Sequence, residues 1–184
     1  DLKGERVSVG APKSDTELNS RDLLMEVGMS YQDFAKVEYL GYSESVELMK
    51  NRQLDATLLS SGLGVAAVRD LATALKIVVI PIPAEVVAKI GDAAYQSGTI
   101  PANTYNGQTS DVNTVLVPNY LVTHAGVSEE MVYKMTKSMT ENLDTMATAH
   151  AAAKAIKKEK MASGSPVPLH PGAEKYYREA GLLK

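Results

Sequence analysis

The residues best placed to do chemistry lie in the stretch GAPKSDTE, residues 10–17, directly after the strand-like run RVSV. Gly10 and Pro12 predict a turn. Ser14 and Glu17 have the S-x-x-E spacing of a capping box, which satisfies unpaired backbone N–H groups at a helix start. A helix start behind a glycine turn also directs N–H groups and the positive end of the helix dipole toward a common point. The stretch therefore fits either a helix cap alone or a cap that also binds a carboxylate or phosphate.

Two further predicted junctions carry similar side chains. Tyr42 and Ser43 follow the second predicted strand, and Ser60, Ser61 and Gly62 follow the third. The carboxyl ends of parallel strands lie at one edge of an open α/β sheet, which is where such sheets bind ligands. These groups suit holding a small polar anion without transforming it. The candidate ligand-binding residues are Lys13, Ser14, Asp15, Thr16, Tyr42, Ser61, Gly62 and Tyr105.

The spacing of apolar residues alternates between the strand and the helix period. Strands are predicted at residues 6–9, 37–40, 56–59, 77–82 and 114–118, and helices at residues 16–27, 43–52 and 64–74. Ser43 is expected to cap the second helix, Ser60 or Ser61 the third, and Gly28 to end the first. Strand and helix in alternation predict a parallel α/β sheet with right-handed crossovers.

The C-terminal third is predicted to be helical. Ser128 precedes a long helix whose apolar stripe is expected to face the core. The members of this stripe are Val132, Met135, Met139, Leu143 and Met146. A short helix is predicted at residues 172–179, behind a proline-rich break.

Composition excludes several classes of function. The chain has 184 residues and a net charge of −3, with its basic residues scattered, so no nucleic-acid partner is expected. There is no cysteine, and His124, His150 and His170 lack partners at metal-ligand spacing, so neither a catalytic residue nor a metal is predicted. The glycine-rich run at residues 62–68 has Ala67 in place of a third glycine, so no nucleotide cofactor is expected either. The apolar run at residues 75–90 contains prolines and charges and is not a membrane span.

Several stretches, taken in order, resemble the TAXI family of receptors for tripartite ATP-independent periplasmic (TRAP) transporters. They are DLKGERVSVGAPKSDTE, GLGVAAVRDLA, TIPANTYNG, NTVLVPNYLVTHAGVSEEMVYKMTKSMTENLD and PLHPGAEKYYREAGLL. The resemblance implies a type II periplasmic-binding-protein fold, in which two α/β lobes close over a small acid. It also implies a periplasmic or extracytoplasmic receptor, not an enzyme, that delivers a glutamate, a glutamine or an oxo-acid to the transporter's membrane subunits.

The chain departs from the family pattern at the candidate site. The family often has G-S-G-T-E where this sequence has Lys13-Ser14-Asp15-Thr16-Glu17, so the anion contact is expected to differ and Asp15 to disfavour a nearby carboxylate. The family also has G-x-P where this sequence has Gly62-Leu63-Gly64, which alters the pocket floor.

The resemblance also implies a division of the chain. Residues 1–82 would form the second lobe, residues 83–113 a crossover and hinge linker, and residues 114–184 a strand and helices that complete the first lobe. The start of that first lobe would precede Asp1. A chain without it is expected either to self-associate, because open sheet edges and apolar patches drive association, or to retain an N-terminal piece that is not in this sequence. Its ligand is expected to bind weakly, because a cleft needs both walls.

Two other functions fit the same fold. One is a ligand-sensing regulatory domain, and the other is an enzyme that acts on a small metabolite. A signal peptide in the full gene would distinguish the receptor from the sensor, and turnover of the bound ligand would distinguish the receptor from the enzyme.

Overall fold

The computed structural model describes residues 2–184, the side chain of Ala151 excepted. The chain forms two compact units, Asp1–Val117 and Pro118–Lys184. All the candidate ligand-binding residues belong to the first unit. The assignment of residues 1–82, 83–113 and 114–184 to lobes of a receptor stays a prediction.

The first unit contains a three-stranded parallel sheet in the order β2-β1-β3. Its strands are β1 (Arg6–Ser8), β2 (Lys36–Glu38) and β3 (Ala56–Thr57). Val7 of β1 is in register with Val37 of β2 and Ala56 of β3. The helices that follow the strands are α1 (Asp15–Glu26), α2 (Tyr42–Lys50) and α3 (Ala66–Ala74), and a 3-10 turn η1 (Tyr31–Asp33) precedes β2. The predicted parallel α/β fold is confirmed, and it is compatible with a periplasmic-binding-protein-like fold.

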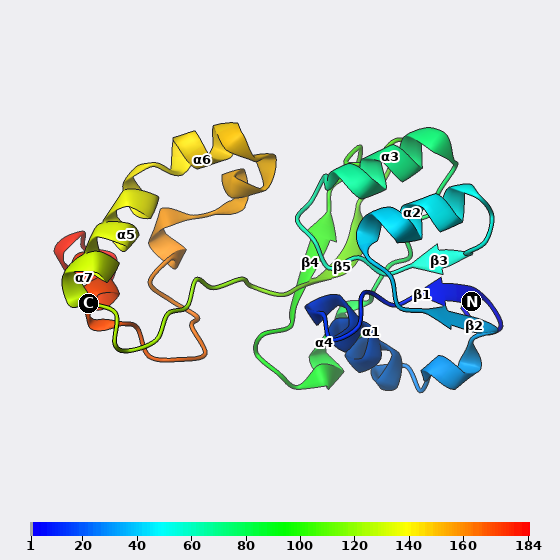
Figure 1. Cartoon of the computed structure of the whole chain (residues 1–184), viewed down its shortest axis with the longest axis horizontal. Coiled ribbons are helices and arrows are strands. Elements are labelled where there is room, and N and C mark those ends of the chain that lie inside the picture. Colours follow the sequence, from blue (N-terminus) through cyan, green and yellow to red (C-terminus); the bar gives the residue numbers. More distant parts are fainter. Residues whose placement is uncertain (1) are drawn as a thin grey trace. The chain divides into compact units, whose positions relative to one another are not determined.

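The alternation of residues in β1 explains why helices cover both of its faces. Val7 and Val9 are buried with Phe34 in one apolar cluster, against which Leu24 of α1 packs. Ser8, between them, points to the other face, where its hydroxyl lies 2.7 Å from that of Ser45 in α2. In Figure 1, α1 and α4 (Ala84–Ile90) accordingly lie on one side of the sheet and α2 and α3 on the other.

A second sheet completes the first unit. It is an antiparallel pair formed by β4 (Gln96–Ile100) and β5 (Val112–Leu116). The strand predicted at residues 77–82 is absent from the described chain, where this stretch is irregular. Pro81 and Pro83 lack backbone N–H groups, so they cannot donate to a strand ladder. Between these two prolines, the amide of Ile82 donates a hydrogen bond to the carbonyl of Asn113 in β5.

The second unit is helical. It contains α5 (Glu129–Glu141), α6 (Leu143–Ala149), η2 (Ala151–Ala155), η3 (Lys158–Lys160) and α7 (Pro171–Glu179). Ser128 caps α5 as predicted, because its hydroxyl accepts from the amide of Met131 at 3.3 Å. The long helix predicted after Ser128 is interrupted at Asn142.

The expectation of a methionine-rich core stripe is wrong. Met135 is 43% exposed, and of the predicted stripe only Val132 is buried. Thr136 and Thr140 are buried instead, since their hydroxyls donate to carbonyl groups one turn earlier in α5 and so need no outside partner.

Gly10, two residues after the end of β1, is the position where the fold most requires glycine. Its φ is 101°, and a Cβ atom there would lie 2.7 Å from Thr16 Cβ and 2.9 Å from the amide nitrogen of Glu17. Gly28 also has a positive φ, of 69°, but a Cβ there would meet nothing within 4 Å. Alanine substitution at Gly28 therefore measures the free-energy cost of the backbone conformation alone, whereas substitution at Gly10 adds the cost of a steric clash.

We predict that Gly28→Ala lowers the free energy of unfolding by about 1–2 kcal/mol, the cost of left-handed backbone. Gly10→Ala should cost about 1–3 kcal/mol more, because it also forces the start of α1 away from β1. Urea unfolding followed by circular dichroism measures both. Equal losses in the two variants would show that the contact between Gly10 and Thr16 is not tight.

Candidate functional site

The hydroxyl of Tyr42 joins the three strand-to-helix junctions of the parallel sheet. It donates to the carbonyl of Ser60, in the loop that follows β3. It also lies 3.1 Å from Oγ1 of Thr16, in the first turn of α1. Because a phenol has one proton, the Thr16 hydroxyl is the donor in that second bond. The structure thus brings Thr16 and Tyr42 together, as the sequence predicts.

The hydrogen bonds continue from Ser60 across α1. Nδ2 of Asn19 donates to Oγ of Ser60 at 2.7 Å, and Oδ1 of Asn19 lies 2.8 Å from the hydroxyl oxygen of Tyr95. The Tyr95 hydroxyl also lies 2.6 Å from Oδ2 of Asp22. Burial and the neighbouring Asp22 carboxylate raise the pKa of Tyr95, so it remains a donor at neutral pH. We call Thr16, Asn19, Tyr42, Ser60 and Tyr95 the junction network.

Asn19 and Tyr95 are absent from the residues predicted as candidates. Asn19 lies three residues after Thr16, so the two share a face of α1, and this spacing is the signal that identifies it. Tyr95 contacts Asn19 across 76 residues of sequence, and no local pattern marks it.

The start of α1 is already occupied by oxygen atoms of the chain itself. Oγ of Ser14 accepts from the amide of Glu17 at 3.2 Å and donates to the carbonyl of Ala11 at 2.7 Å. The amide of Thr16 donates to Oδ1 of Asp15 at 2.9 Å. A solute anion at this helix start would share its N–H groups with these oxygens. Lys13 is exposed nearby in sequence, with a φ of 61°.

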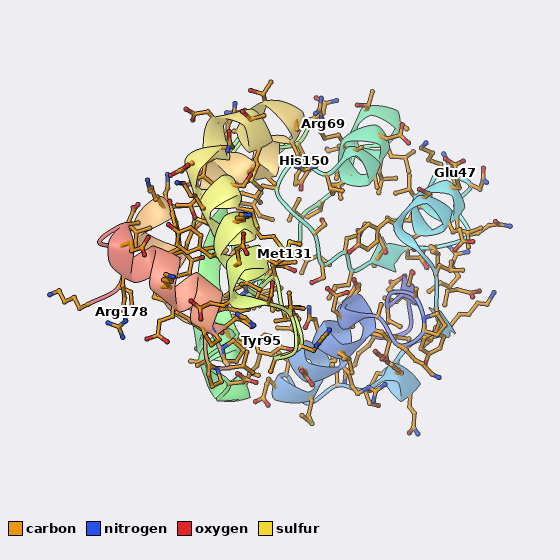
Figure 2. All side chains as sticks on the ribbon, turned by 60° about the vertical axis from the view of Figure 1, so that its left-hand side comes forward. Glu47, Arg69, Tyr95, Met131, His150 and Arg178 are labelled. Carbon is orange, nitrogen blue, oxygen red and sulfur yellow. The ribbon has the colours of Figure 1, made fainter. Side chains whose placement is uncertain are left out.

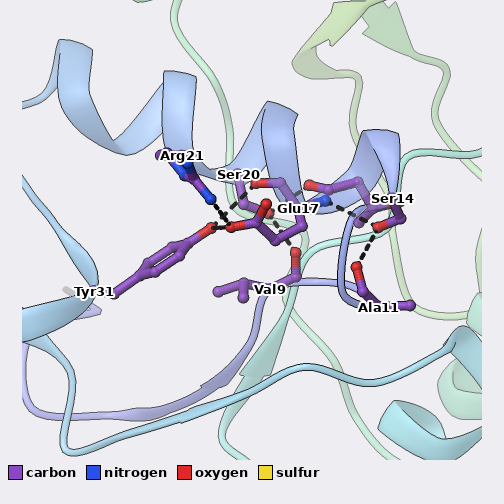
Figure 3. Close-up of polar contacts among 8 residues, drawn as sticks. Val9, Ala11, Ser14, Glu17, Ser20, Arg21 and Tyr31 are labelled. Atoms are coloured by element: carbon purple, nitrogen blue, oxygen red, sulfur yellow. Dashed lines mark hydrogen bonds and ion pairs between the residues drawn. The ribbon is translucent and has the colours of Figure 1, made fainter.

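The predicted capping box forms only in part, because Glu17 has other partners (Figure 3). Its side chain is almost fully buried and accepts from Arg21 at 2.6 Å and from the Tyr31 hydroxyl at 3.0 Å. The hydrogen bond from Arg21 holds the pKa of Glu17 below its ordinary value. Burial, followed by the Glu17 carboxylate, raises the pKa of Tyr31 to about 12. Glu17 therefore anchors the first turns of α1 beside the site.

The other predicted residues lie in the loops around the network. Ser61 and Gly62 are exposed in the loop between β3 and α3. Tyr105 is buried, and its hydroxyl accepts from the amide of Gly64 at 3.3 Å. This bond ties a turn near residue 105 to the loop that carries Ser61 and Gly62.

Two predicted helix caps are wrong. The N-cap of α2 is Gly41, not Ser43, and Oε2 of Glu44 accepts from the Gly41 amide at 3.0 Å. The N-cap of α3 is Val65, so neither Ser60 nor Ser61 caps it. The Ser60 hydroxyl is instead bonded to Asn19 in the junction network. The predicted end of α1 at Gly28 is confirmed, since its amide donates to the carbonyl of Met25.

The site offers hydroxyl, amide and peptide groups that can hold a small polar solute. Among residues 2–184, no cluster of three or more His, Cys, Asp or Glu side chains could hold a metal ion. In the same part of the chain, no helix is both long enough and apolar enough to cross a membrane.

A parallel α/β unit with polar groups gathered at the carboxyl ends of its strands is compatible with a periplasmic-binding-protein-like fold. The model of the NMT1-like family matches residues 1–181, and the chain belongs to this family. Its members are periplasmic solute-binding-like proteins and are typically extracytoplasmic. The predicted role in binding a small molecule is thus supported at the level of the family. Membership of the TAXI group stays a prediction.

We expect Glu17→Gln to lower the free energy of unfolding at neutral pH by about 1 kcal/mol, since it removes a charge-assisted hydrogen bond. Because the pKa of Glu17 lies below 4.5 in the folded chain, its stabilisation is complete above pH 4.5 and is lost as the pH falls through the folded value. The difference between wild type and variant should therefore shrink in acid.

Urea unfolding at a series of pH values checks this expectation. Glu26→Gln, the same change at the other end of α1, is the matched control and should follow the wild-type curve. A stability difference for Glu17→Gln that is independent of pH would contradict the assignment.

Proposed function

We propose that the chain is the periplasmic receptor of a TRAP transporter, and that it binds a small carboxylate at the junction network. The proposal rests above all on the Tyr42 hydroxyl, which links Thr16 to Ser60 at the carboxyl ends of three parallel strands. The family of solute-binding proteins to which the chain belongs supports the general role. The resemblance to TAXI receptors supports the two finer parts of the proposal, that the solute is a carboxylate and that it is delivered to a TRAP transporter.

The hydroxyl groups of Thr16 and Tyr42 are the donors suited to a carboxylate. Thr16 is 2% exposed, so its hydroxyl is held in place, whereas Tyr42 is half-buried. Each of these protons is given to an oxygen of the chain. A solute carboxylate is the stronger acceptor, because hydrogen bonds to ionised groups are shorter and stronger than those between neutral groups.

The residues around the start of α1 add charges of both signs. Lys13 and Asp15 are exposed on either side of Ser14. A solute that carries both a carboxylate and an ammonium group, such as glutamate or glutamine, suits this pair. Asp15 also disfavours a solute whose only charge is negative, so we propose an amino acid as the preferred class at this site.

Tyr42→Phe tests the site, because it removes one hydroxyl and leaves the ring. We predict that it weakens binding of the preferred solute about tenfold or more, as measured by isothermal titration calorimetry with glutamate, glutamine and 2-oxoglutarate. Tyr39→Phe is the matched control, since Tyr39 is 45% exposed and its ring forms a T-shaped contact with that of Tyr31. Wild-type affinity in Tyr42→Phe, or no binding of any of the three acids by the wild type, would contradict the proposal.

The transporter part of the proposal has a separate test. Proteoliposomes that contain the membrane subunits of a TRAP transporter from the same organism should take up labelled solute when the chain is added outside. We predict no uptake above background without the chain. Uptake that is equal with and without it would rule out delivery to this transporter.

A further inference from the structure

A polar cleft lies away from the junction network, between α3 and the turn formed by residues 103–107. Its volume is about 330 Å³, within the range of pockets that bind small molecules. Arg69 and Thr73 of α3 form one wall, and the turn from Asn103 to Gly107 forms the other. The whole cleft belongs to the first unit.

The cleft has one charged group, the guanidinium of Arg69. No carboxylate lines it. The guanidinium groups of Arg6, Arg21 and Arg178 each pair with an acidic side chain. Arg69, which lies on α3 (Figure 2), forms no ion pair with any residue that the structure describes. Its charge is therefore available to an anion from solution.

Hydrogen bonds fix the second wall before any ligand arrives. Nδ2 of Asn106 donates to the carbonyl of Ala72 in α3 at 3.2 Å, which holds the two walls together. Nε2 of Gln108 donates to the carbonyls of Pro101 and Ser110, each at 3.0 Å. The buried Tyr105 is bonded through its hydroxyl to the amide of Gly64. A preformed wall lowers the entropy cost of binding.

We propose that this cleft binds a small hydroxylated monocarboxylic acid. A guanidinium can hold a carboxylate through two parallel hydrogen bonds. The hydroxyls of Thr73 and Thr104 donate to the carbonyls of Arg69 and Pro101, so their oxygens can accept from hydroxyl groups of the solute, and the Asn103 amide can donate or accept. Because no carboxylate lines the cleft, an α-ammonium group has no charged partner there. The cleft thus prefers a hydroxy acid to the corresponding amino acid, which is opposite to the preference proposed at the junction network.

Glycerate and serine test this preference, since they differ only in a hydroxyl or an ammonium group at the second carbon. We expect millimolar glycerate, at constant ionic strength, to shift the backbone amide signals of Thr73 and Gly107 in ¹⁵N NMR spectra of the full chain. Serine should leave these signals in place. Equal shifts with both compounds, or none with glycerate, would overturn the proposal.

Arg69→Gln should weaken glycerate binding about tenfold or more, because it removes the charged partner of the carboxylate. Arg52→Gln is the matched control, with the same change of charge at an exposed arginine outside the cleft, and should bind as the wild type does. Equal affinity in wild type and Arg69→Gln would show that Arg69 does not hold the acid. Glycerate should shift the Thr73 and Gly107 signals in Tyr42→Phe as it does in the wild type, because these two residues line the cleft and not the junction network, so this proposal and the proposed function fail independently.

Discussion

The contact of the Tyr42 hydroxyl with both Thr16 and the Ser60 carbonyl is the interaction on which the site depends. It requires the start of α1 to lie close to the end of β1, and this is possible because Gly10 has no Cβ atom to meet Thr16. Ser20 holds α1 in the same place, since its hydroxyl is bonded to the carbonyl of Val9 at 3.0 Å. The site therefore depends on the position of the backbone at the start of α1, which brings the hydroxyl groups of Thr16 and Tyr42 within hydrogen-bond distance.

The parallel sheet of the first unit and the helices α1 to α3 could be predicted from local pattern, whereas α4 and β4 were not. The alternation in residues 6–9 and the S-x-x-E spacing at Ser14 are short-range signals, and both correspond to observed elements. The strand predicted at residues 77–82 has strong β-branched character, yet Pro81 within it and Pro83 directly after it cannot donate to a strand ladder. The stripe containing Met135 fails for a different reason, because helical spacing alone does not reveal which face of a helix another element covers.

The site could be predicted only where its residues follow a strand. Thr16 and Tyr42 sit at strand-to-helix junctions, so the rule for parallel sheets finds them. Tyr95 and the Arg69 cleft arise from contacts between segments far apart in sequence, such as Asn106 with Ala72. That Asp15 disfavours a nearby carboxylate stays a prediction; in the structure its Oδ1 accepts from the amide of Thr16 at the helix start. Local sequence thus identifies which edge of the sheet carries the site, while its full membership depends on tertiary contacts.

The central claim is that a carboxylate solute binds where Thr16 and Tyr42 meet. The most direct measurement is isotope-filtered NMR of the full chain with ¹³C-labelled glutamate, which detects protons of the solute close to protons of the protein. The account predicts cross-peaks from glutamate to the Tyr42 ring and the Thr16 methyl group. Cross-peaks confined to residues outside the junction network, such as Thr73 or Asn106 at the Arg69 cleft, would contradict it.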